Sequence, residues 1–454
     1  MTTPLKRIDR LRATGFQGLD EIELTFAKPI EEGAGQWIVL LGDNGTGKSS
    51  LLRALAIVLG PGLGLLHEVS SRRGSLVRMG TAEAVIDCSY GGEPLHCGIP
   101  EKLVGSYISG DYYTGFIVGY GALRGTALGG PKRAVEIDEL GILGVRSLFL
   151  EDSPVIHAET WLRDLAFAGS KDALAEARLR SVLAVLTKVL PDVSSIEVEP
   201  DRTWITSTTM GRMPLAALSD GYLTSAGWLV DMIARWVQYA STHEIELGPD
   251  FVSKIEGIAL VDEIDLHLHP RWQVDIIRTL RETFPRMNFV VTTHNPLTIQ
   301  GARSGEVWVL RRELAADGTV RIDAEQRDIP PGMRADQILT GEWFGLPSTL
   351  DPETQELLRR HRELLREGRA EGDLERDRLE EELRGRLGRF NETSAEELAR
   401  KIIADAGEVP VQQLPELREK FKREFRAHMS KPRTKRATKK TAKKPPRKRA
   451  SAHR

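Results

Sequence analysis

The chain of 454 residues is 41% hydrophobic and 28% charged, which provides enough apolar material for a large core and two structural units. It contains no apolar run near the roughly 18 residues that cross a bilayer, and its start lacks the layout of a secretory signal, so we expect a cytoplasmic protein with no membrane partner. The net charge of −2 hides an acidic body and a basic end, because residues 431–454 hold twelve Lys or Arg and no acid, against 51 basic and 65 acidic residues in 1–430.

The first part of the chain alternates strand-like and helix-like patterns. Residues 8–26 read as two short strands joined by a glycine turn, and the apolar run at 37–41 reads as a strand buried on both faces. A glycine loop at 42–49 follows, and Leu and Ala then recur at helical spacing. Residues 80–130 contain several short β-like runs.

The alternation continues to about residue 350. Helical patterns occupy 153–190, the stretch from about 219 to 240, and 271–284, whereas strand patterns occupy 194–207, 257–263 and 288–294. Because helices connect the buried strands, we predict an α/β fold with a mostly parallel core sheet, an antiparallel β subdomain and a helical insert at about 153–190.

The end of the chain changes character. Residues 351–430 read as a charged helical appendage, with a first helix capped at Asp351 and a second at about 394–407. Residues 431–454 cannot bury enough apolar surface to become ordered. We therefore expect a main α/β domain at 1–350, then the charged helical appendage and a disordered basic tail.

The glycine loop matches the phosphate-binding pattern Gly42-x4-Gly47-Lys48-Ser49, and it lies between a strand and a helix as that motif requires. Glycines let backbone N–H groups converge on phosphate oxygens, and the helix N-terminus adds a positive dipole end. Lys48 can reach the β- and γ-phosphates, and Ser49 can ligate Mg²⁺. We therefore expect ATP contacts from Gly42, Asp43, Asn44, Gly45, Thr46, Gly47, Lys48, Ser49 and Ser50.

Two adjacent carboxylates, Asp262 and Glu263, end the strand predicted at 257–263. Beside a phosphate loop, Asp262 would hold Mg²⁺ through water and Glu263 would orient or deprotonate the attacking water. His294 ends another strand, where it can touch the γ-phosphate. Without the phosphate loop, all three would read as ordinary structural residues, so these roles depend on the companion motifs.

Two further groups of side chains admit a metal. Asp265, His267 and His269 alternate and could converge on zinc, but no further ligand stands at zinc spacing, so a loop that contacts a partner subunit is favoured. Cys88 and Cys97 are the only cysteines, and we expect buried thiols rather than a disulfide or a metal site.

The stretch ALSDGY at 217–222 reads by itself as a helix N-cap at Ser219. Combined with the other motifs, Ser219, Asp220 and Gly221 look like an ABC-type signature, whose serine and helix N-terminus face the γ-phosphate of ATP bound to another subunit. The phosphate loop and the signature would then meet across a two-fold dimer, with ATP between them and hydrolysis separating the halves.

The ordered motifs GDNGTGKS, YGALR at 120–124, LSDGY, ALVDEIDLHLHP and VVTTHNP, with WFGL at 343–346, resemble those of ABC-type ATPases related to SMC, RecF and OLD proteins. More narrowly, they are similar to bacterial AAA-family ATPases of anti-phage operons, such as the Septu and retron-associated ATPases. The resemblance covers about residues 5–350. It implies a P-loop NTPase fold of the ABC/SMC head type and an ATPase that uses Mg²⁺.

The same resemblance assigns residues. Lys48, Glu263 and His294 would be catalytic, Ser49 and Asp262 would hold Mg²⁺, Asp265 would lie in the D-loop, and Arg124 would lie in the Q-loop region. The chain departs from the family at Phe16-Gln17-Gly18, where relatives often have an arginine in place of Gln17. It also departs at 350–430, which reads as helical where OLD proteins carry a nuclease.

We favour the first of three functions and keep the other two as alternatives. The first is an ATP-hydrolysing switch in anti-phage defence or DNA repair, which forms a homodimer or higher oligomer and controls a separate effector such as a nuclease or toxin. The second is a transporter nucleotide-binding subunit, although such subunits usually carry LSGGQ. The third is a DNA-binding structural protein whose Lys/Arg tail, 431–454, contacts phosphates without reading sequence; that tail could instead fold over the acidic body.

Overall fold

The computed structural model describes residues 5–387 except 29–30, 32, 61–64, 67, 71–75, 103–105, 111–112, 123–143, 151–152, 154, 191, 218–219, 315–319 and 369–372. The side chains of residues 220–226 and 320 are also not described. The helix predicted at 394–407 and the basic tail therefore lie outside the described residues. The chain divides into two compact units, Met1–Thr349 and Leu350–Arg454.

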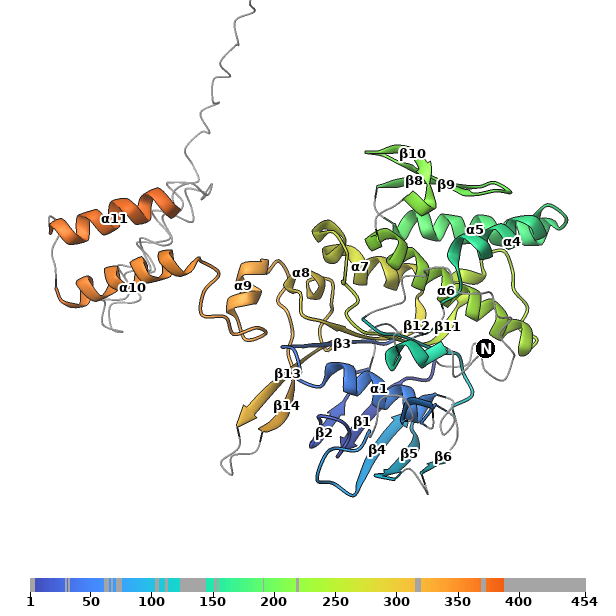
Figure 1. Cartoon of the computed structure of the whole chain (residues 1–454), viewed down its shortest axis with the longest axis horizontal. Coiled ribbons are helices and arrows are strands. Elements are labelled where there is room, and N and C mark those ends of the chain that lie inside the picture. The colour runs from blue at the N-terminus through green and yellow to red at the C-terminus, as the bar shows by residue number, and fades with distance from the viewer. Residues whose placement is uncertain are drawn as a thin grey trace, which may run out of the picture. The chain divides into compact units, whose positions relative to one another are not determined.

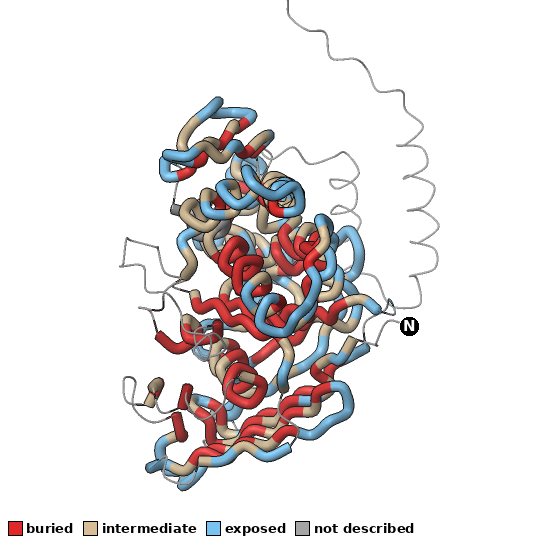
Figure 2. Tube along the Cα trace, turned by 90° about the vertical axis from the view of Figure 1, so that its right-hand side faces the viewer, coloured by how far each residue is buried: buried red, intermediate tan, exposed pale blue. Residues whose placement is uncertain are grey.

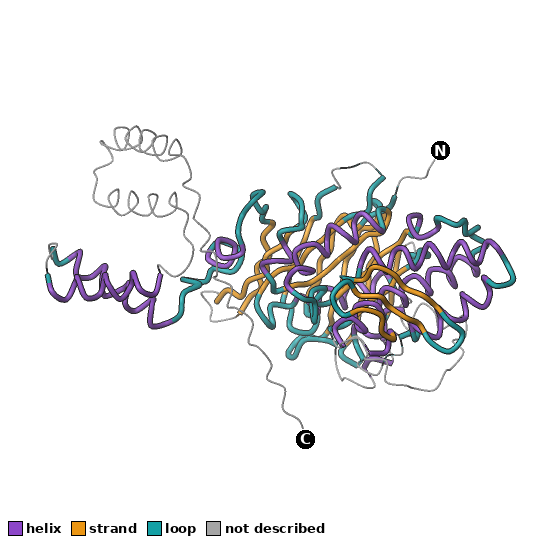
Figure 3. Tube along the Cα trace, turned by 90° about the horizontal axis from the view of Figure 1, so that it is seen from above, coloured by secondary structure: helices purple, strands orange, loops and turns teal. Residues whose placement is uncertain are grey.

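A six-stranded sheet forms the centre of the first unit, in the order β14-β13-β3-β12-β11-β7 (Figure 1). Five of its strands run parallel, and only β14 is antiparallel to its neighbour β13. Figure 3, in which strands are orange and helices purple, shows these strands grouped in the middle of the unit. The strands are β3 (Trp37–Gly42), β7 (Ile117–Tyr120), β11 (Glu256–Val261), β12 (Arg286–Thr293), β13 (Val307–Leu314) and β14 (Val320–Gln326).

Both faces of this sheet are covered, which explains why its strands read as continuous apolar runs. Alternate residues of β3 face opposite sides: Val39 and Leu41 join a core with the helices α4 to α7, whereas Ile38 and Leu40 join a core with α1. Figure 2 shows buried residues, in red, concentrated in the interior and exposed residues, in pale blue, towards the outside. The helices are α1 (Lys48–Leu59), α4 (Ala158–Gly169), α5 (Ala173–Val189), α6 (Asp220–Thr242) and α7 (Pro270–Thr283).

An antiparallel sheet, in the order β2-β1-β4-β5-β6, lies on the α1 side (Figure 1). Its strands alternate between buried and exposed residues, and the buried side chains pack with α1 in a shared core. Cys88 and Cys97 lie on this inner face as free, buried thiols, as predicted. The strands are β1 (Ile8–Thr14), β2 (Glu21–Thr25), β4 (Glu83–Tyr90), β5 (Glu93–Pro100) and β6 (Tyr107–Gly110).

The helical insert contains α4 and α5, and a small antiparallel sheet follows it in the order β10-β9-β8. Asp172 caps α5 by accepting from the backbone N–H groups of Leu174 and Ala175. Short elements complete the unit: β8 (Val193–Val198), β9 (Thr203–Ser207), β10 (Gly211–Pro214), α8 (Pro296–Ile299), α9 (Ala335–Thr340) and 3₁₀ turns at Arg146–Leu148, Leu215–Ala217 and Phe251–Lys254.

The predicted fold class, a mostly parallel core sheet with an antiparallel β subdomain, a helical insert and a C-terminal helical appendage, is confirmed. One part of the core is absent from the sequence-based prediction, namely the β13–β14 hairpin. Only Val307–Leu310 of β13 is buried, and the rest of the strand is exposed and mostly charged, so the apolar run is too short to stand out. In the described part of the chain, no helix is long and apolar enough to cross a membrane.

The second unit contains two charged helices that contact each other, α10 (Pro352–Arg366) and α11 (Leu374–Leu387). Asp351 caps α10 as predicted and accepts from the backbone N–H of Thr354 at 3.0 Å. The two helices bury only Leu364 and Leu383 among their hydrophobic residues, and ion pairs such as Arg360–Glu375 join them. The helix pair therefore has only a small hydrophobic core. Each exposed ion pair adds only about 0–1 kcal/mol to its stability.

Candidate nucleotide-binding site

The phosphate loop connects the end of β3 to the start of α1. Gly45 and Gly47 have φ values of 77° and 88°, in the left-handed region that favours glycine. A Cβ atom on Gly47 would also lie 2.4 Å from Cδ2 of Leu19. Glycine is therefore needed at both positions for the loop to turn tightly and for its N–H groups to open helix α1, as an anion-binding loop requires.

Lys48 folds back over this loop. Its Nζ donates to the carbonyl oxygens of Gly42 and Asp43 at 2.7 and 2.9 Å, and the residue is only 7% exposed. Burial lowers the pKa of the Lys48 ammonium, and the nearby carboxylates of Asp262, Glu263 and Asp43 oppose that shift. The Lys48 ammonium is thus bound to two neutral carbonyl oxygens of the loop. Negatively charged phosphate oxygens would be stronger hydrogen-bond partners and would replace them.

Arg312, on β13, braces the same loop from the outside. Its Nε and Nη2 donate to the carbonyl oxygen of Gly45 at 3.0 and 2.5 Å. This arginine is missing from the sequence-based prediction, because 267 residues separate it from Gly45 and no motif marks it. The contact fixes the orientation of one peptide group within the loop.

Three side chains meet where β3, β12 and β11 end. Ser49 Oγ donates to Asp262 Oδ2 at 2.7 Å, and Thr292 Oγ1 donates to Asp262 Oδ1 at 2.6 Å. The backbone N–H of Glu263 in turn donates to Thr292 Oγ1 at 2.7 Å. The fold therefore brings the predicted residues Ser49 and Asp262 together and adds Thr292, which the sequence-based prediction passes over although it lies in the quoted stretch VVTTHNP.

This arrangement fits a magnesium ion. Mg²⁺ prefers oxygen ligands and is usually held by one or two protein groups together with phosphates and water, and the Ser49 hydroxyl and Asp262 carboxylate supply such donors side by side. Asp265, by contrast, is buried, and His269 caps α7 by accepting from the N–H of Arg271. Among the residues that the structure describes, no three His, Cys, Asp or Glu side chains gather into a metal site.

Glu263 and His294 lie together next to this cluster. Glu263 adopts a left-handed conformation with φ 48°, which is uncommon for a residue other than glycine and often marks a functional position. Its Oε1 lies 3.9 Å from Nδ1 of His294, whose side chain is 53% exposed. The predicted catalytic residues Lys48, Glu263 and His294 thus share the carboxyl edge of the sheet, where open α/β sheets bind ligands.

Other predicted residues are not placed at this site. Ser219 and Arg124 lie outside the described residues, and Asp220 and Gly221 form the first turn of α6 with side chains that are not described. Gln17 accepts from Nη1 of Arg53 at 3.4 Å.

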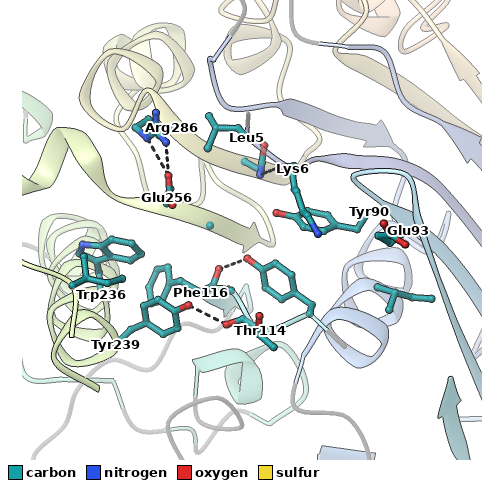
Figure 4. A pocket seen from close by; sticks show the side chains of 16 residues that line it. Leu5, Lys6, Tyr90, Glu93, Thr114, Phe116, Trp236, Tyr239, Glu256 and Arg286 are labelled. Atoms are coloured by element: carbon teal, nitrogen blue, oxygen red, sulfur yellow. Dashed lines mark hydrogen bonds and ion pairs between the residues drawn. The ribbon is translucent and has the colours of Figure 1, made fainter. Parts of the chain in front are cut away.

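A cavity of about 440 Å³ lies at the opposite edge of the sheet, at the amino ends of β7, β11 and β12 (Figure 4). Aromatic rings of Tyr90, Phe116, Trp236 and Tyr239 line it, and Glu256 and Arg286 pair at its rim. None of the predicted nucleotide-binding residues lines this cavity.

The chain is similar to several known proteins. Residues 163–300, which include α6, Asp262, Glu263 and His294, match the family described as "AAA domain, putative AbiEii toxin, Type IV TA system". The Septu protein PtuA of Bacillus mycoides (strain KBAB4) is 27% identical over 370 residues, which are 79% of this chain and 47% of that protein. The Retron Ec83 probable ATPase of Escherichia coli is 46% identical over 67 residues, which are 14% of this chain and 12% of that protein.

The chain thus spans about half the length, or less, of these curated relatives. Among solved structures, an SMC head bound to the C-winged helix domain of ScpA aligns with a TM-score of 0.43 and 14% identity, over 70% of this chain and 97% of that one. The predicted resemblance is confirmed: the chain is similar to Septu PtuA and to the retron ATPases, and its residues 163–300 match the model of an AAA domain.

Proposed function

We propose that the protein is an ATP-binding and ATP-hydrolysing molecular switch. The observation that carries this proposal is the hydrogen bond between Ser49 and Asp262, because it joins the phosphate loop to the acidic strand end in the arrangement that Mg²⁺-dependent nucleotide hydrolysis requires. The relatedness to proteins named probable ATPases supports the same activity.

In the proposed bound state, backbone N–H groups of residues 42–50 surround the triphosphate. Lys48 exchanges the carbonyl oxygens of Gly42 and Asp43 for β- and γ-phosphate oxygens. Ser49 and Asp262 would hold Mg²⁺, which would supply positive charge to balance that of the phosphates. Thr292 keeps the Asp262 carboxylate in its orientation.

Glu263 and His294 act on the γ-phosphate. Glu263 orients a water molecule and takes its proton while the water oxygen bonds to the γ-phosphorus. The bond from that phosphorus to the β–γ bridging oxygen breaks, which releases ADP and phosphate. His294, with an exposed ring 3.9 Å from the Glu263 carboxylate, contacts the γ-phosphate and responds to its loss.

The switch depends on a second copy of the chain. The ring of His294 is half-exposed, so the γ-phosphate end of the site is open to a partner surface. In this proposal the N-terminus of α6 from a second protomer, with Ser219 directly before it in the sequence, faces the γ-phosphate, because a helix N-terminus favours an anion. ATP then holds two protomers together, and hydrolysis releases them. Asp265 lies in the loop after Glu263, at the same edge.

The relatives support a proposal for the role of the protein in the cell. Similarity to Septu PtuA and to a retron ATPase supports a role in anti-phage defence in which the switch controls a separate effector, such as a nuclease or toxin. The basic segment 431–454 supports contact with DNA. Residues 1–350 would supply the ATPase, and 351–430 would be an appendage to it.

Two variants test the proposal. Lys48→Ala should abolish ATP hydrolysis, whereas Glu263→Gln should bind ATP but stall and so accumulate an ATP-dependent dimer, measured by light scattering with and without Mg-ATP. Asp275→Asn, at a half-exposed position on α7 where the carboxylate pairs with Arg278, serves as a control that keeps both properties. Undiminished hydrolysis by Lys48→Ala would overturn the assignment of this site.

A further inference from the structure

A buried ionic cluster joins α6 to the core sheet. It consists of Tyr120, Asp231 and Arg235, which we call the Asp231 cluster. Tyr120 donates its hydroxyl to Asp231 Oδ2 at 2.8 Å, and Nε of Arg235 donates to the same oxygen at 2.7 Å. The side chains of Asp231 and Arg235 are 1% and 7% exposed, so water reaches neither of them freely.

The cluster is an inefficient way to stabilise a helix. A buried ion pair loses the hydration of both charges, and well-packed apolar residues of the same size often stabilise as much or more. The cluster instead fixes the orientation of α6 relative to the core sheet, because each hydrogen bond restricts an angle as well as a distance. Asp231 also accepts from the backbone N–H of Ile156 at 2.7 Å, which ties in the segment leading to α4.

Tyr120 reaches the nucleotide site through its backbone. It is the last residue of β7, where it pairs with Val261 of β11, and its carbonyl oxygen accepts from the backbone N–H of Asp262 at 2.8 Å. One residue therefore contacts the magnesium-binding aspartate by its main chain and α6 by its side chain. This residue belongs to the YGALR stretch, whose later part lies outside the described residues.

α6 is attached to β7 at a second level. Near the amino end of the strand, Phe116 packs edge-on against Trp236 at a centroid distance of 5.3 Å, and the Tyr239 hydroxyl donates to the carbonyl oxygen of Thr114 at 3.0 Å (Figure 4). Aromatic packing thus fixes the later part of α6, and the Asp231 cluster fixes its middle. The helix begins at Asp220, directly after Ser219 and ~16 Å along the axis from Asp231.

We propose that Tyr120 and Asp231 are positioning residues that set the angle of α6, and with it the place of the helix N-terminus at Asp220, relative to Asp262 and Glu263. This inference rests on the proposed function and adds to it. It states how one protomer keeps a constant geometry between its Asp262–Glu263 strand end and the N-terminus of its α6, which would serve two different composite sites. A tilt of α6 about its aromatic attachment would displace its first turn most, and the Tyr120–Asp231 hydrogen bond opposes that tilt.

The test is Tyr120→Phe, which removes one hydroxyl and keeps the ring, compared with Tyr239→Phe, which removes the other hydroxyl that links α6 to the β7 side. Both are made in the Glu263→Gln protein. We expect ATP affinity of the single protomer to stay within about twofold in both. ATP-dependent dimerisation should weaken about tenfold or more in Tyr120→Phe only, as expected for a lost hydrogen bond to a buried charged group.

A second measurement does not depend on dimerisation. Hydrogen exchange of single protomers should be faster over residues 220–230 in Tyr120→Phe, and unchanged over the phosphate loop and in Tyr239→Phe. Unchanged exchange over 220–230, or an equal increase throughout the chain, overturns the inference. If the Glu263→Gln parent does not dimerise with ATP, the proposed function fails instead, and the exchange result alone decides the role of the cluster.

Discussion

Ser49 and Asp262 lie 213 residues apart in the sequence and share a hydrogen bond of 2.7 Å. Thr292 holds the other oxygen of the same carboxylate, so Asp262 is oriented from two sides before any ligand arrives. Preorganisation of this kind lowers the reorganisation needed when Mg-ATP binds.

Thr292→Val should impair hydrolysis more than nucleotide binding. The change keeps the shape of the side chain but removes the donor to Asp262 and the acceptor for the Glu263 N–H. We expect kcat to fall about tenfold to a hundredfold, from ~1.5–3 kcal/mol for a hydrogen bond to a charged group. Steady-state ATPase assays measure this, and Thr292→Ser should recover most of the activity. Equal losses in the Val and Ser variants would contradict the assigned role.

Arg312→Ala should weaken ATP binding without unfolding the protein. Its guanidinium braces the Gly45 peptide group from an exposed position, so its loss frees the loop and costs about 0.5–1.5 kcal/mol in nucleotide affinity. Titration with a fluorescent ATP analogue should show a Kd raised a few fold to about tenfold. Arg311→Ala, at the neighbouring exposed position, is the matched control. A Kd that changes equally in both variants would mean that general surface charge, and not the brace, is responsible.

The two thiols should be inert in the folded protein. Burial raises the pKa of Cys88 and of Cys97 to about 12, so almost no thiolate exists at pH 8. A chromogenic disulfide reagent should therefore titrate no thiol in native protein at pH 8 and two thiols in denaturant. Fast labelling of the native protein would contradict the burial of this face.

The same thiols should make stability depend on alkaline pH. Their folded pKa values exceed the unfolded value of about 9, so the stabilising contribution is complete below pH 9 and is lost as pH rises towards 12. Urea unfolding at several pH values should show a steeper decline for the wild type than for Cys88→Ala/Cys97→Ala. Parallel curves would show that other groups cause the decline.

The basic tail should add salt-dependent affinity for duplex DNA. If about six of its charges neutralise phosphates, the affinity of the full chain should fall ~10³-fold between about 50 and about 200 mM salt, and deletion of 431–454 should remove most of that dependence. Fluorescence anisotropy with a labelled duplex measures both. A variant with the tail's Lys and Arg replaced by Gln separates charge from length, and unchanged binding after deletion would exclude tail-mediated contact.

Local patterns predicted the elements that carry the motifs. The apolar run before Gly42 and the carboxylates after Val261 mark β3 and β11, because strands buried on both faces are continuously apolar and polar residues end them. The placement of Lys48, Ser49, Asp262, Glu263 and His294 at one edge follows from the parallel arrangement of these strands.

Contacts that depend on tertiary packing could not be predicted in this way. Arg312 reaches Gly45 from the exposed, mostly charged end of β13, and Asp231 reads in sequence as an ordinary helix residue until the fold places Tyr120 against it. Thr292 lay within a quoted motif, but its role is visible only when β12 is found between β3 and β11. A single sequence carries the local signals and leaves the partners of long-range polar contacts open.

The position of β12 has a further consequence. Neighbouring strands lie about 4.8 Å apart, so the one strand between β3 and β11 keeps the ends of those two strands ~10 Å from each other. That width belongs to the ladder of the sheet, which is rigid, and it does not depend on flexible connections. The space between the ends of β3 and β11, in which a hydrated cation and a phosphate group would sit, therefore has a constant width, whichever nucleotide occupies it.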